Sequence, residues 1–178
     1  MKNVTECEEL VRSDPQLGSL QCVFQSGGLR RQDSVREGLA RLDADCEIVL
    51  IHDGVRPFIS PSLIDQCVEI AFKEGAVVVG IPAQDTIKFI APNRQVLSTP
   101  PRNSLWEIQT PQVFRTGIIR EAHHRAALEG IEATDDAMLV ERLGKKVNLL
   151  EGQRTNIKIT VPEDLLFAEA LIRQGRVP

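Results

Sequence analysis

The sequence predicts an α/β fold in which a mostly parallel sheet carries helices on both faces. Two apolar runs, residues 47–51 and 76–81, contain almost no polar side chains, which is typical of strands buried on both faces. An amphipathic helical segment separates them, and this strand–helix–strand spacing is that of a βαβ unit. A third apolar run, at 20–24, precedes another helical segment and is expected to form the first strand. Successive units of this kind favour a sheet covered on both sides.

The remaining elements follow from periodicity and from end signals. A helix is expected over 34–42, where Ser34 and Glu37 fit a capping box. The next helix is expected to begin at Pro61, because proline suits the first turn, and to end at Gly75. Further periodic segments predict helices over 116–128, 135–143 (capped by Thr134) and 162–174, and a strand over 147–150.

Residues 86–90 and 95–99 predict a two-stranded hairpin with a turn between them. An isolated hairpin with few large apolar residues is marginally stable in water. We therefore expect this arm, about residues 85–102, to pack against another surface, for which a second subunit is one candidate. Residues 1–178 contain no repeat, low-complexity stretch or linker, so we expect one domain with a protruding arm.

Composition limits the classes of function. The chain has 178 residues, with 21 Lys and Arg against 25 Asp and Glu, so its formal charge is −4. This mildly acidic balance gives no support for general binding to nucleic acid, and an aromatic content of 4% without tyrosine argues against a base-stacking surface. No apolar run approaches the roughly 20 residues of a membrane span, and the polar first residues do not resemble a secretion signal.

The four cysteines favour a reduced, cytoplasmic protein. Cys7, Cys22, Cys46 and Cys67 form no CxxC or CxH pair, so a zinc site is not expected. Buried thiols that stay reduced in the cytoplasm are the simplest interpretation.

Polar residues that follow the apolar strands are the candidates for a site, because open parallel sheets bind ligands at the carboxyl ends of their strands. The first cluster is SGGLRRQDS at 26–34. Paired glycines let the backbone approach a ligand, and the helix start that follows favours an anion or a hydrogen-bond acceptor. The plainer interpretation is a glycine turn with Ser34 as a helix cap, and the segment matches neither a Walker A loop nor a GxGxxG fingerprint.

The second cluster, HDGVRP, begins at His52, directly after the most apolar strand. Asp53 offers a hard oxygen ligand for Mg²⁺, and Arg56 offers a planar fork for phosphate. An Asp–Arg ion pair that only stabilises the loop is an equally good interpretation. His52 is expected to be structural, and the two histidines at 123–124 to be exposed on a helix.

A third series of polar clusters lies next to later apolar segments, and each has a plain interpretation as a turn, a strand end or a cap. The series contains Thr86, Arg102, Thr110, Thr134 and Lys158. Lys158 stands out because it lies between Ile157 and Ile159 in a strand-like stretch, where an unpaired lysine is costly. We expect an anion beside it.

Six motifs appear in one order: GGLRRQDSV, IHDGVRPF, PAQDTIKF, LWEIQTPQVF, TDDAMLVE and EGQRTNIKITVPEDL. From Gly27 to Leu171 the chain thereby resembles the 2-C-methyl-D-erythritol 4-phosphate cytidylyltransferases of the non-mevalonate isoprenoid pathway. The resemblance implies a Rossmann-like nucleotidyltransferase fold, a homodimer, Mg²⁺, and CTP as co-substrate. It also implies that the phosphate of methylerythritol phosphate attacks the α-phosphorus of CTP and that pyrophosphate leaves.

The same resemblance implies a role for one or more residues of each motif. Gly28 and Ser34 match the nucleotide-binding residues that contact the cytosine. Asp53 matches the metal-binding carboxylate, and Gly54 offers its backbone to the substrate. The other matches, which bind the substrate, are Arg56, Thr86, Arg102, Thr110 and Thr134. Lys158 would stabilise charge on the phosphates in the transition state, so Lys158 and Asp53 are the expected catalytic residues. The hairpin matches a dimerisation arm, from which some residues reach across the dimer.

The chain departs from the family pattern in two places. Leu29 stands where the family often has an acidic residue. No counterpart of the AAGxGxRMG loop and PKQ segment, which cradle the CTP triphosphate in the family, precedes Gly27. We therefore expect an N-terminally incomplete domain whose first βα unit is missing, and no measurable pyrophosphate release from these 178 residues alone.

Two other functions are open at this point. One is a complete chain that acts as an inactive binding or dimerisation module. The other is a ribitol-5-phosphate cytidylyltransferase, from a sister family with a similar HDxVRPF loop. Val55 matches the valine of that loop. The Leu105–Trp106 pair before QTPQ and the TDDA motif at Thr134 resemble the methylerythritol enzymes more closely.

Overall fold

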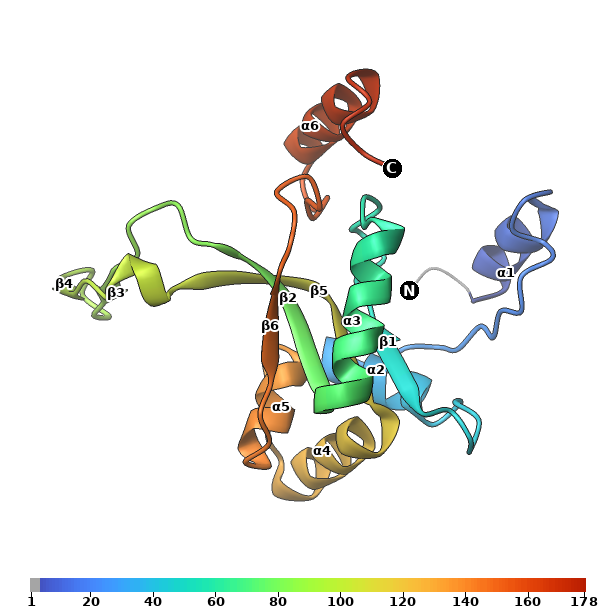
Figure 1. Ribbon diagram of the computed structural model, residues 1–178, viewed down its shortest axis with the longest axis horizontal. Helices are drawn as coiled ribbons and strands as arrows, with labels where there is room; N and C mark the ends of the chain where they lie inside the picture. The colour runs from blue at the N-terminus through green and yellow to red at the C-terminus, as the bar shows by residue number, and fades with distance from the viewer. Residues whose placement is uncertain (1–3) are drawn as a thin grey trace.

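A four-stranded mixed sheet forms the centre of the protein in the computed structural model, which describes residues 4–178 (Figure 1). Its strands stand in the order β1 (Ile48–Ile51), β5 (Trp106–Arg115), β2 (Ala76–Pro82) and β6 (Asn148–Glu151). Strands β2 and β6 are parallel, whereas β5 is antiparallel to both β1 and β2. Three strands therefore point in one direction and β5 opposes them, which confirms the α/β fold.

Helices cover both faces of this sheet. One face carries α3 (Pro61–Glu74), and the other carries α2 (Arg31–Leu39), α4 (Thr116–Glu129) and α5 (Asp136–Arg142). Successive residues of β2 alternate between these layers, as the pleat of a strand requires. Val77 and Val79 pack in the cluster with α3, whereas Ala76 and Val78 pack in the cluster on the opposite face.

Helix α3 and strand β2 lie where the sequence predicts them. Pro61 occupies the first turn of α3, and Gly75 ends the helix with φ at 97°. A side chain is rarely tolerated at that backbone angle, so glycine suits this position. All residues of β2 except its last, Pro82, are buried, in agreement with the predicted strand buried on both faces.

Strand β1 is half-buried rather than buried on both faces as predicted. The reason is its position, because β1 lies at the edge of the sheet and pairs only with β5. Strand β5, which separates it from β2, was not predicted from the sequence at all.

The N-terminal region begins with helix α1 (Val4–Ser13), none of whose residues is buried. Two features that follow it differ from the prediction. Residues 20–24 form no strand, and Leu20 and Val23 are 57% and 66% exposed. A strand needs a hydrogen-bonding neighbour, and no described strand lies beside this segment. Helix α2 begins at Arg31 rather than at Ser34, and its cap involves Asp33, whose carboxylate accepts a hydrogen bond from the Arg30 N–H (3.3 Å).

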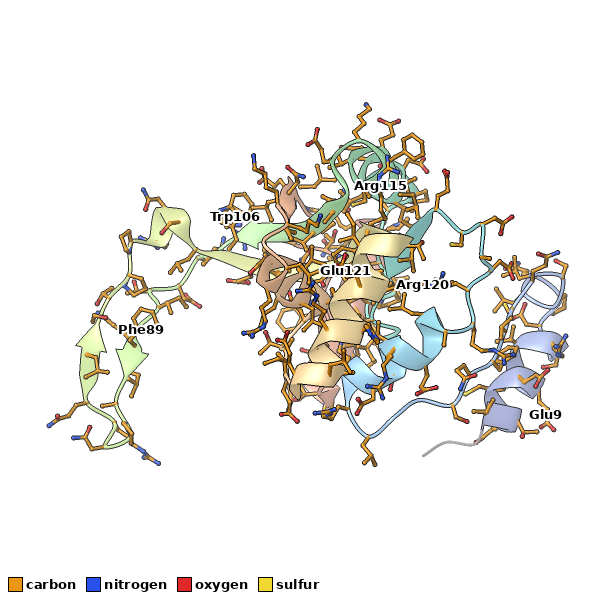
Figure 2. The ribbon with its side chains drawn as sticks, turned by 90° about the horizontal axis from the view of Figure 1, so that it is seen from below. Glu9, Phe89, Trp106, Arg115, Arg120 and Glu121 are labelled. Atoms are coloured by element: carbon orange, nitrogen blue, oxygen red, sulfur yellow. The ribbon has the colours of Figure 1, made fainter. Side chains whose placement is uncertain are left out.

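The predicted hairpin is confirmed as a projecting arm. Strands β3 (Phe89–Ile90) and β4 (Val96–Ser98) pair antiparallel in a sheet of their own. Figure 2 shows the arm extending away from the helices and the central sheet, with Phe89 in its outer part. All residues of β3 and β4 are exposed, so the arm presents an apolar surface.

The C-terminal elements follow the prediction closely. Helix α5 is capped by Asp135, whose carboxylate accepts from the Met138 N–H (2.9 Å), and not by Thr134 as predicted. Strand β6 and helix α6 (Pro162–Arg173) match the predicted segments within one residue at each end. Helix α6 stands apart from the sheet, with Ala168 its one buried residue (Figure 1).

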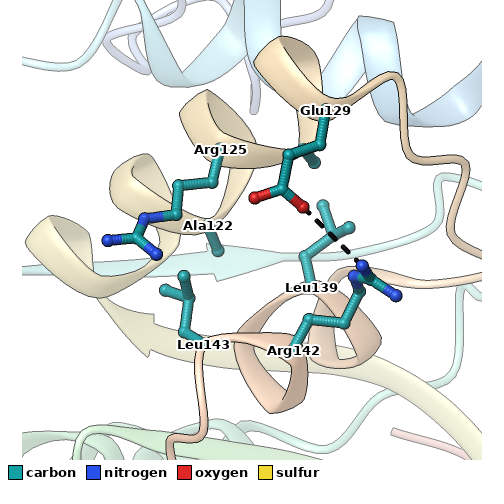
Figure 3. A pocket seen from close by; sticks show the side chains of 7 residues that line it. Ala122, Arg125, Glu129, Leu139, Arg142 and Leu143 are labelled. Carbon is teal, nitrogen blue, oxygen red and sulfur yellow. Dashed lines mark ion pairs between the residues drawn. The ribbon is translucent and has the colours of Figure 1, made fainter.

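The seam between α4 and α5 holds a cavity of only about 30 Å³ (Figure 3). Ala122, Leu139 and Leu143 form its apolar part, and an ion pair between Arg142 and Glu129 (3.6 Å) spans it. None of the sequence-predicted site residues lines it, so this is a packing seam. Within residues 4–178, every helix is too short or too polar to cross a lipid bilayer.

Candidate active site

A larger cavity, of about 140 Å³, opens where the loop after β1, the middle of β5 and the loop after β6 meet. Five of the residues singled out in the sequence line it, namely Asp53, Arg56, Thr110, Thr134 and Lys158. They come from four separate sequence motifs. The fold therefore brings together the candidates that the strand-end argument predicted.

A break in the pairing of β2 with β5 frees Thr110 from the strand ladder. Val78 pairs with Gln112, but the next residue, Val79, pairs with Gln109. The two residues between them have no partner on β2, and the peptide bond that follows Thr110 is cis. Irregularities of this kind re-aim side chains next to functional sites. Here the Thr110 side chain reaches the loop after β1.

The loop after β1 is tied down by that threonine. The Thr110 hydroxyl accepts a hydrogen bond from the Asp53 N–H (3.0 Å) and donates to His52 Nδ1 (3.1 Å). His52 Nε2 in turn donates to the backbone carbonyl of Arg56 (2.8 Å). Both ring nitrogens of His52 are thus used, one by Thr110 of β5 and one within the loop, in agreement with its predicted structural role.

Asp53 is surrounded by three cations. Lys158 Nζ lies 3.1 Å and Arg56 Nε 3.9 Å from Asp53 Oδ2, while Arg31 Nε lies 3.3 Å from Oδ1. Burial alone would raise the pKa of Asp53, but Lys158 and Arg31 outweigh it and hold the pKa below its ordinary value. Asp53 is therefore ionised at neutral pH, and the predicted Asp–Arg pair is present as one contact among several.

The Lys158 loop is held against β5 by a buried amide. Asn156 is fully buried, and its Nδ2 donates to Gln109 Oε1 (3.2 Å). The N–H of Ile159 donates to the carbonyl of Val55 (2.8 Å), which joins this loop to the one that carries Asp53. These bonds place Lys158 over Asp53, and they explain how a lysine between two isoleucines obtains an anionic partner.

Gln112 fixes the opposite wall of the cavity. Its side-chain oxygen accepts from the Asp136 and Ala137 N–H groups (3.1 Å each), and its Nε2 donates to Asp135 Oδ2 (2.8 Å). The start of α5 is thereby attached to β5, which brings Thr134 to the rim.

Gly28 and Ser34 form a turn outside the cavity. The Gly28 N–H donates to Ser34 Oγ (3.0 Å), which itself donates to the Arg30 carbonyl (3.2 Å). A Cβ on Gly28 would lie 2.3 Å from the Cβ of Asp33, so only glycine fits this close approach. The turn borders the start of α2, and the start of a helix favours a ligand with acceptor groups.

Two predicted substrate residues do not line this cavity within one chain. Thr86 and Arg102 are exposed at the base of the arm, and Arg102 donates to the Gln84 carbonyl (2.7 Å). Neither lines the cavity. Gly54 is exposed in the loop directly after Asp53.

Comparison with known proteins identifies the family of this chain. The profile of the family described as IspD, 2-C-methyl-D-erythritol 4-phosphate cytidylyltransferase, matches residues 4–174. The chain belongs to this family. A curated cytidylyltransferase of this name from Geotalea uraniireducens is 53% identical over 150 residues, which cover 83% of the chain and 64% of the relative. The chain spans 63–65% of the length of the first curated relatives.

Solved structures of IspD proteins share the fold. The 2-C-methyl-D-erythritol 4-phosphate cytidylyltransferase of Thermus thermophilus superposes with a TM-score of 0.79 at 42% identity, covering 87% of this chain and 75% of that one. The 4-diphosphocytidyl-2C-methyl-D-erythritol synthase of Anaerococcus prevotii gives 0.78 at 38% identity, covering 83% and 66%. The nucleotidyltransferase fold that the motifs implied is thus confirmed.

Several cavity residues received no individual role from the sequence. Arg31, Gln109, Gln112 and Asp135 line the cavity, and they lie within the predicted polar clusters without having been singled out there. One signal was available for Arg31, because an arginine in the first turn of a helix opposes the helix dipole and calls for a carboxylate partner. His123, expected on the surface, is instead 2% exposed, since its Nε2 donates to buried Asp136 (2.9 Å).

The described residues offer little for a metal ion on their own. Between residues 4 and 178, no three His, Cys, Asp or Glu side chains cluster as a metal site would require. Asp53 supplies one carboxylate to the cavity, with cations on both of its oxygens.

Proposed function

We propose that this protein transfers CMP from CTP to 2-C-methyl-D-erythritol 4-phosphate, which gives 4-diphosphocytidyl-2-C-methyl-D-erythritol and pyrophosphate. The observation that carries the proposal is the convergence of Asp53, Arg56, Thr110 and Lys158 on one cavity in an IspD chain. Arg31, Arg56 and Lys158 bring three cationic groups to the cavity, and cationic groups of this kind bind phosphate. The names of the relatives support the methylerythritol acceptor over ribitol phosphate.

Positioning and charge neutralisation suffice for this reaction, which needs no covalent intermediate with the protein. An oxygen of the acceptor phosphate forms a bond to the α-phosphorus of CTP, and the bond from that phosphorus to the pyrophosphate oxygen breaks. Negative charge grows on the phosphoryl oxygens as this happens. The Lys158 ammonium, 45% exposed and next to the cavity, is the group that would stabilise it.

The other cavity residues would bind the acceptor. The guanidinium of Arg56 has the fork geometry that matches phosphate, and its Nη1 donates to the Asn156 carbonyl (2.7 Å), which holds it in place. Burial lowers the pKa of Arg56 and Asp53 opposes this, yet an arginine stays charged at neutral pH. The hydroxyls of Thr110 and Thr134 and the backbone of Gly54 complete the substrate wall.

We assign the nucleotide base to the turn at Gly28 and Ser34. The support is the close glycine approach and the adjacent start of α2.

We propose that the arm joins two protomers in a homodimer. In one chain Thr86 and Arg102 do not line the cavity, and an arm that crosses to a second protomer would let them serve the cavity of that protomer. The exposed Phe89, Val96 and Leu97 support this, because an apolar projection of this kind favours burial against another surface. The whole chain, 1–178, would form one domain around the central sheet, and it would work in the cytoplasm.

Mg²⁺ is proposed as the ion that accompanies CTP. In nucleotide sites this ion is held by one or two carboxylates together with substrate phosphates and water. Asp53 fits that pattern as the single carboxylate, and it would hold the ion once phosphates are present. The ion would supply further charge neutralisation to the triphosphate.

The test is product identification. The protein expressed from its own gene is incubated with CTP, Mg²⁺ and methylerythritol phosphate, and the phosphorus NMR spectrum is recorded. We expect a new diphosphate diester together with pyrophosphate. Recovery of both substrates unchanged would overturn the proposal.

A further inference from the structure

The side chain of Arg31 bridges two carboxylates that belong to different parts of the fold. Its Nε lies 3.3 Å from Asp53 Oδ1, and its Nη1 lies 2.7 Å from Asp136 Oδ2. Arg31 is the first residue of α2, and Asp136 is the first residue of α5. The guanidinium therefore links the candidate active site to the buried start of a neighbouring helix.

Asp136 is a rigid anchor for this arginine. Asp136 is 1% exposed, and its second oxygen, Oδ1, accepts a hydrogen bond from His123 Nε2 (2.9 Å). His123 is itself only 2% exposed. Its backbone N–H donates to Gln112 (3.1 Å). A buried carboxylate without a cation is strongly unfavourable. The ion pair between Arg31 and Asp136 is therefore expected to stay formed.

Lys158 is bound to the same Asp53 in a different way. It uses the other oxygen, Oδ2, at 3.1 Å, and this is its one side-chain contact among the described residues. Its side chain is 45% exposed and rises from a loop without regular secondary structure. The third cation, Arg56, is 3.9 Å from Asp53 and is held by the carbonyl of Asn156.

We infer that Arg31 is the permanent counter-charge and positioning residue of Asp53, and that Lys158 is the exchangeable one. When a phosphate enters the cavity, the Lys158 ammonium can turn from Asp53 to the phosphate, because Arg31 still compensates Asp53 and fixes its orientation. Without Arg31, Asp53 would retain Lys158, and the phosphate would lose one of the two cations, Lys158 and Arg56, that face it. The inference rests on the proposed function, since that function supplies the phosphate.

The test follows Lys158 directly. Reductive ¹³C-methylation of lysines keeps their charge and gives each an NMR signal, and the Lys158 signal is assigned by its loss in Lys158→Arg. Methylerythritol phosphate is titrated into the wild type, Arg31→Met, Arg31→Lys and the control Arg36→Met. Arg36 lies on the same helix but contacts only Asp33 (3.6 Å) among the described acidic residues.

We expect the Lys158 signal to shift on ligand addition in the wild type and in Arg36→Met with equal affinity. In Arg31→Met the dissociation constant should rise about tenfold, within the usual range of coupling between sites, and the shift should be largely lost. In Arg31→Lys, whose ammonium can reach one carboxylate at a time, the dissociation constant should lie between those of the wild type and Arg31→Met. If Arg31→Met does not fold, the same titration is made with Arg31→Lys and Asp136→Asn. Both substitutions should weaken the binding of methylerythritol phosphate.

Two results would overturn the inference. One is equal binding and an equal Lys158 shift in the Arg31 and Arg36 variants. The other is a wild-type Lys158 signal that ligand does not move. Failure of the proposed function is seen separately, as wild-type protein that binds the ligand but forms no product from CTP.

Discussion

Lys158 Nζ lies 3.1 Å from Asp53 Oδ2, so the two residues expected to be catalytic are in direct contact. The contact joins the loop after β6 to the loop after β1, across strands β2 and β5. It gives Lys158 the anion that its place between two isoleucines requires.

Replacing Lys158 tests its proposed role on the transferred phosphoryl group. In the protein expressed from its own gene, Lys158→Ala should lower kcat by at least about 10²-fold, the scale of one lost transition-state donor. Steady-state pyrophosphate release measures this, with Lys145→Ala, an exposed lysine outside the cavity, as the matched control. A near-wild-type kcat would show that Lys158 only stabilises the loop.

Replacing Asp53 has a second consequence besides loss of rate. Asp53→Ala should lower kcat by at least about 10²-fold, because the cavity loses its carboxylate. It also leaves Arg31, Arg56 and Lys158 without their shared partner, so the melting temperature should fall. Thermal unfolding and initial rates are measured together. Asp65→Ala, on the outer surface of α3, is the control, and equal behaviour of the two variants would contradict the account.

The arm residues should act on binding. Thr86→Ala and Arg102→Ala are expected to raise KM for the acceptor phosphate and to leave kcat nearly unchanged, because they would bind ground and transition states alike. Lys88→Ala is the control, since its ammonium donates within the arm to Thr99 (2.7 Å). An unchanged KM in both variants would remove Thr86 and Arg102 from the site.

Acid should destabilise the start of α6. The N–H groups of Thr160 and Val161 donate to Asp164 (2.7 and 3.0 Å) and hold the pKa of that carboxyl below its ordinary value of about 3.9. A lowered folded-state pKa contributes stability that is present above the unfolded value and is lost as pH falls through the folded one.

Urea unfolding between pH 6 and pH 3 checks this. Asp164→Asn can still accept these hydrogen bonds but does not titrate, so its stability should fall less steeply below about pH 4 than that of the wild type. Glu163→Gln, one residue away, is the control. Identical pH profiles for the wild type and Asp164→Asn would contradict the prediction.

The sequence predicted elements well where local signals and tertiary packing agree. The segment from Pro61 through Gly75 into β2 carries a helix start, a helix stop and a continuous apolar run, and all three are borne out. Strand β5 was missed because Gln109 to Gln112 place polar residues and a proline in its middle. A proline in a central strand normally argues against that strand. The break in register at this point accommodates it.

Residues 20–24 illustrate the opposite error. Their β-branched and aromatic character favours a strand, yet strand formation depends on a neighbouring strand that the described chain does not supply. Within the site, Asp53 was predicted because it follows an apolar strand, and Lys158 because it lies between two isoleucines. Arg31 was not, because only the fold shows that Asp53 and Asp136 lie on either side of it.

The most direct test of the central claim is a comparison of two acceptors. Initial rates of pyrophosphate release from CTP are measured for the protein expressed from its own gene, with methylerythritol phosphate and with ribitol 5-phosphate. The account predicts turnover that depends on methylerythritol phosphate and a clear preference for it in kcat/KM. A preference for ribitol 5-phosphate, or no release with either acceptor, would contradict it.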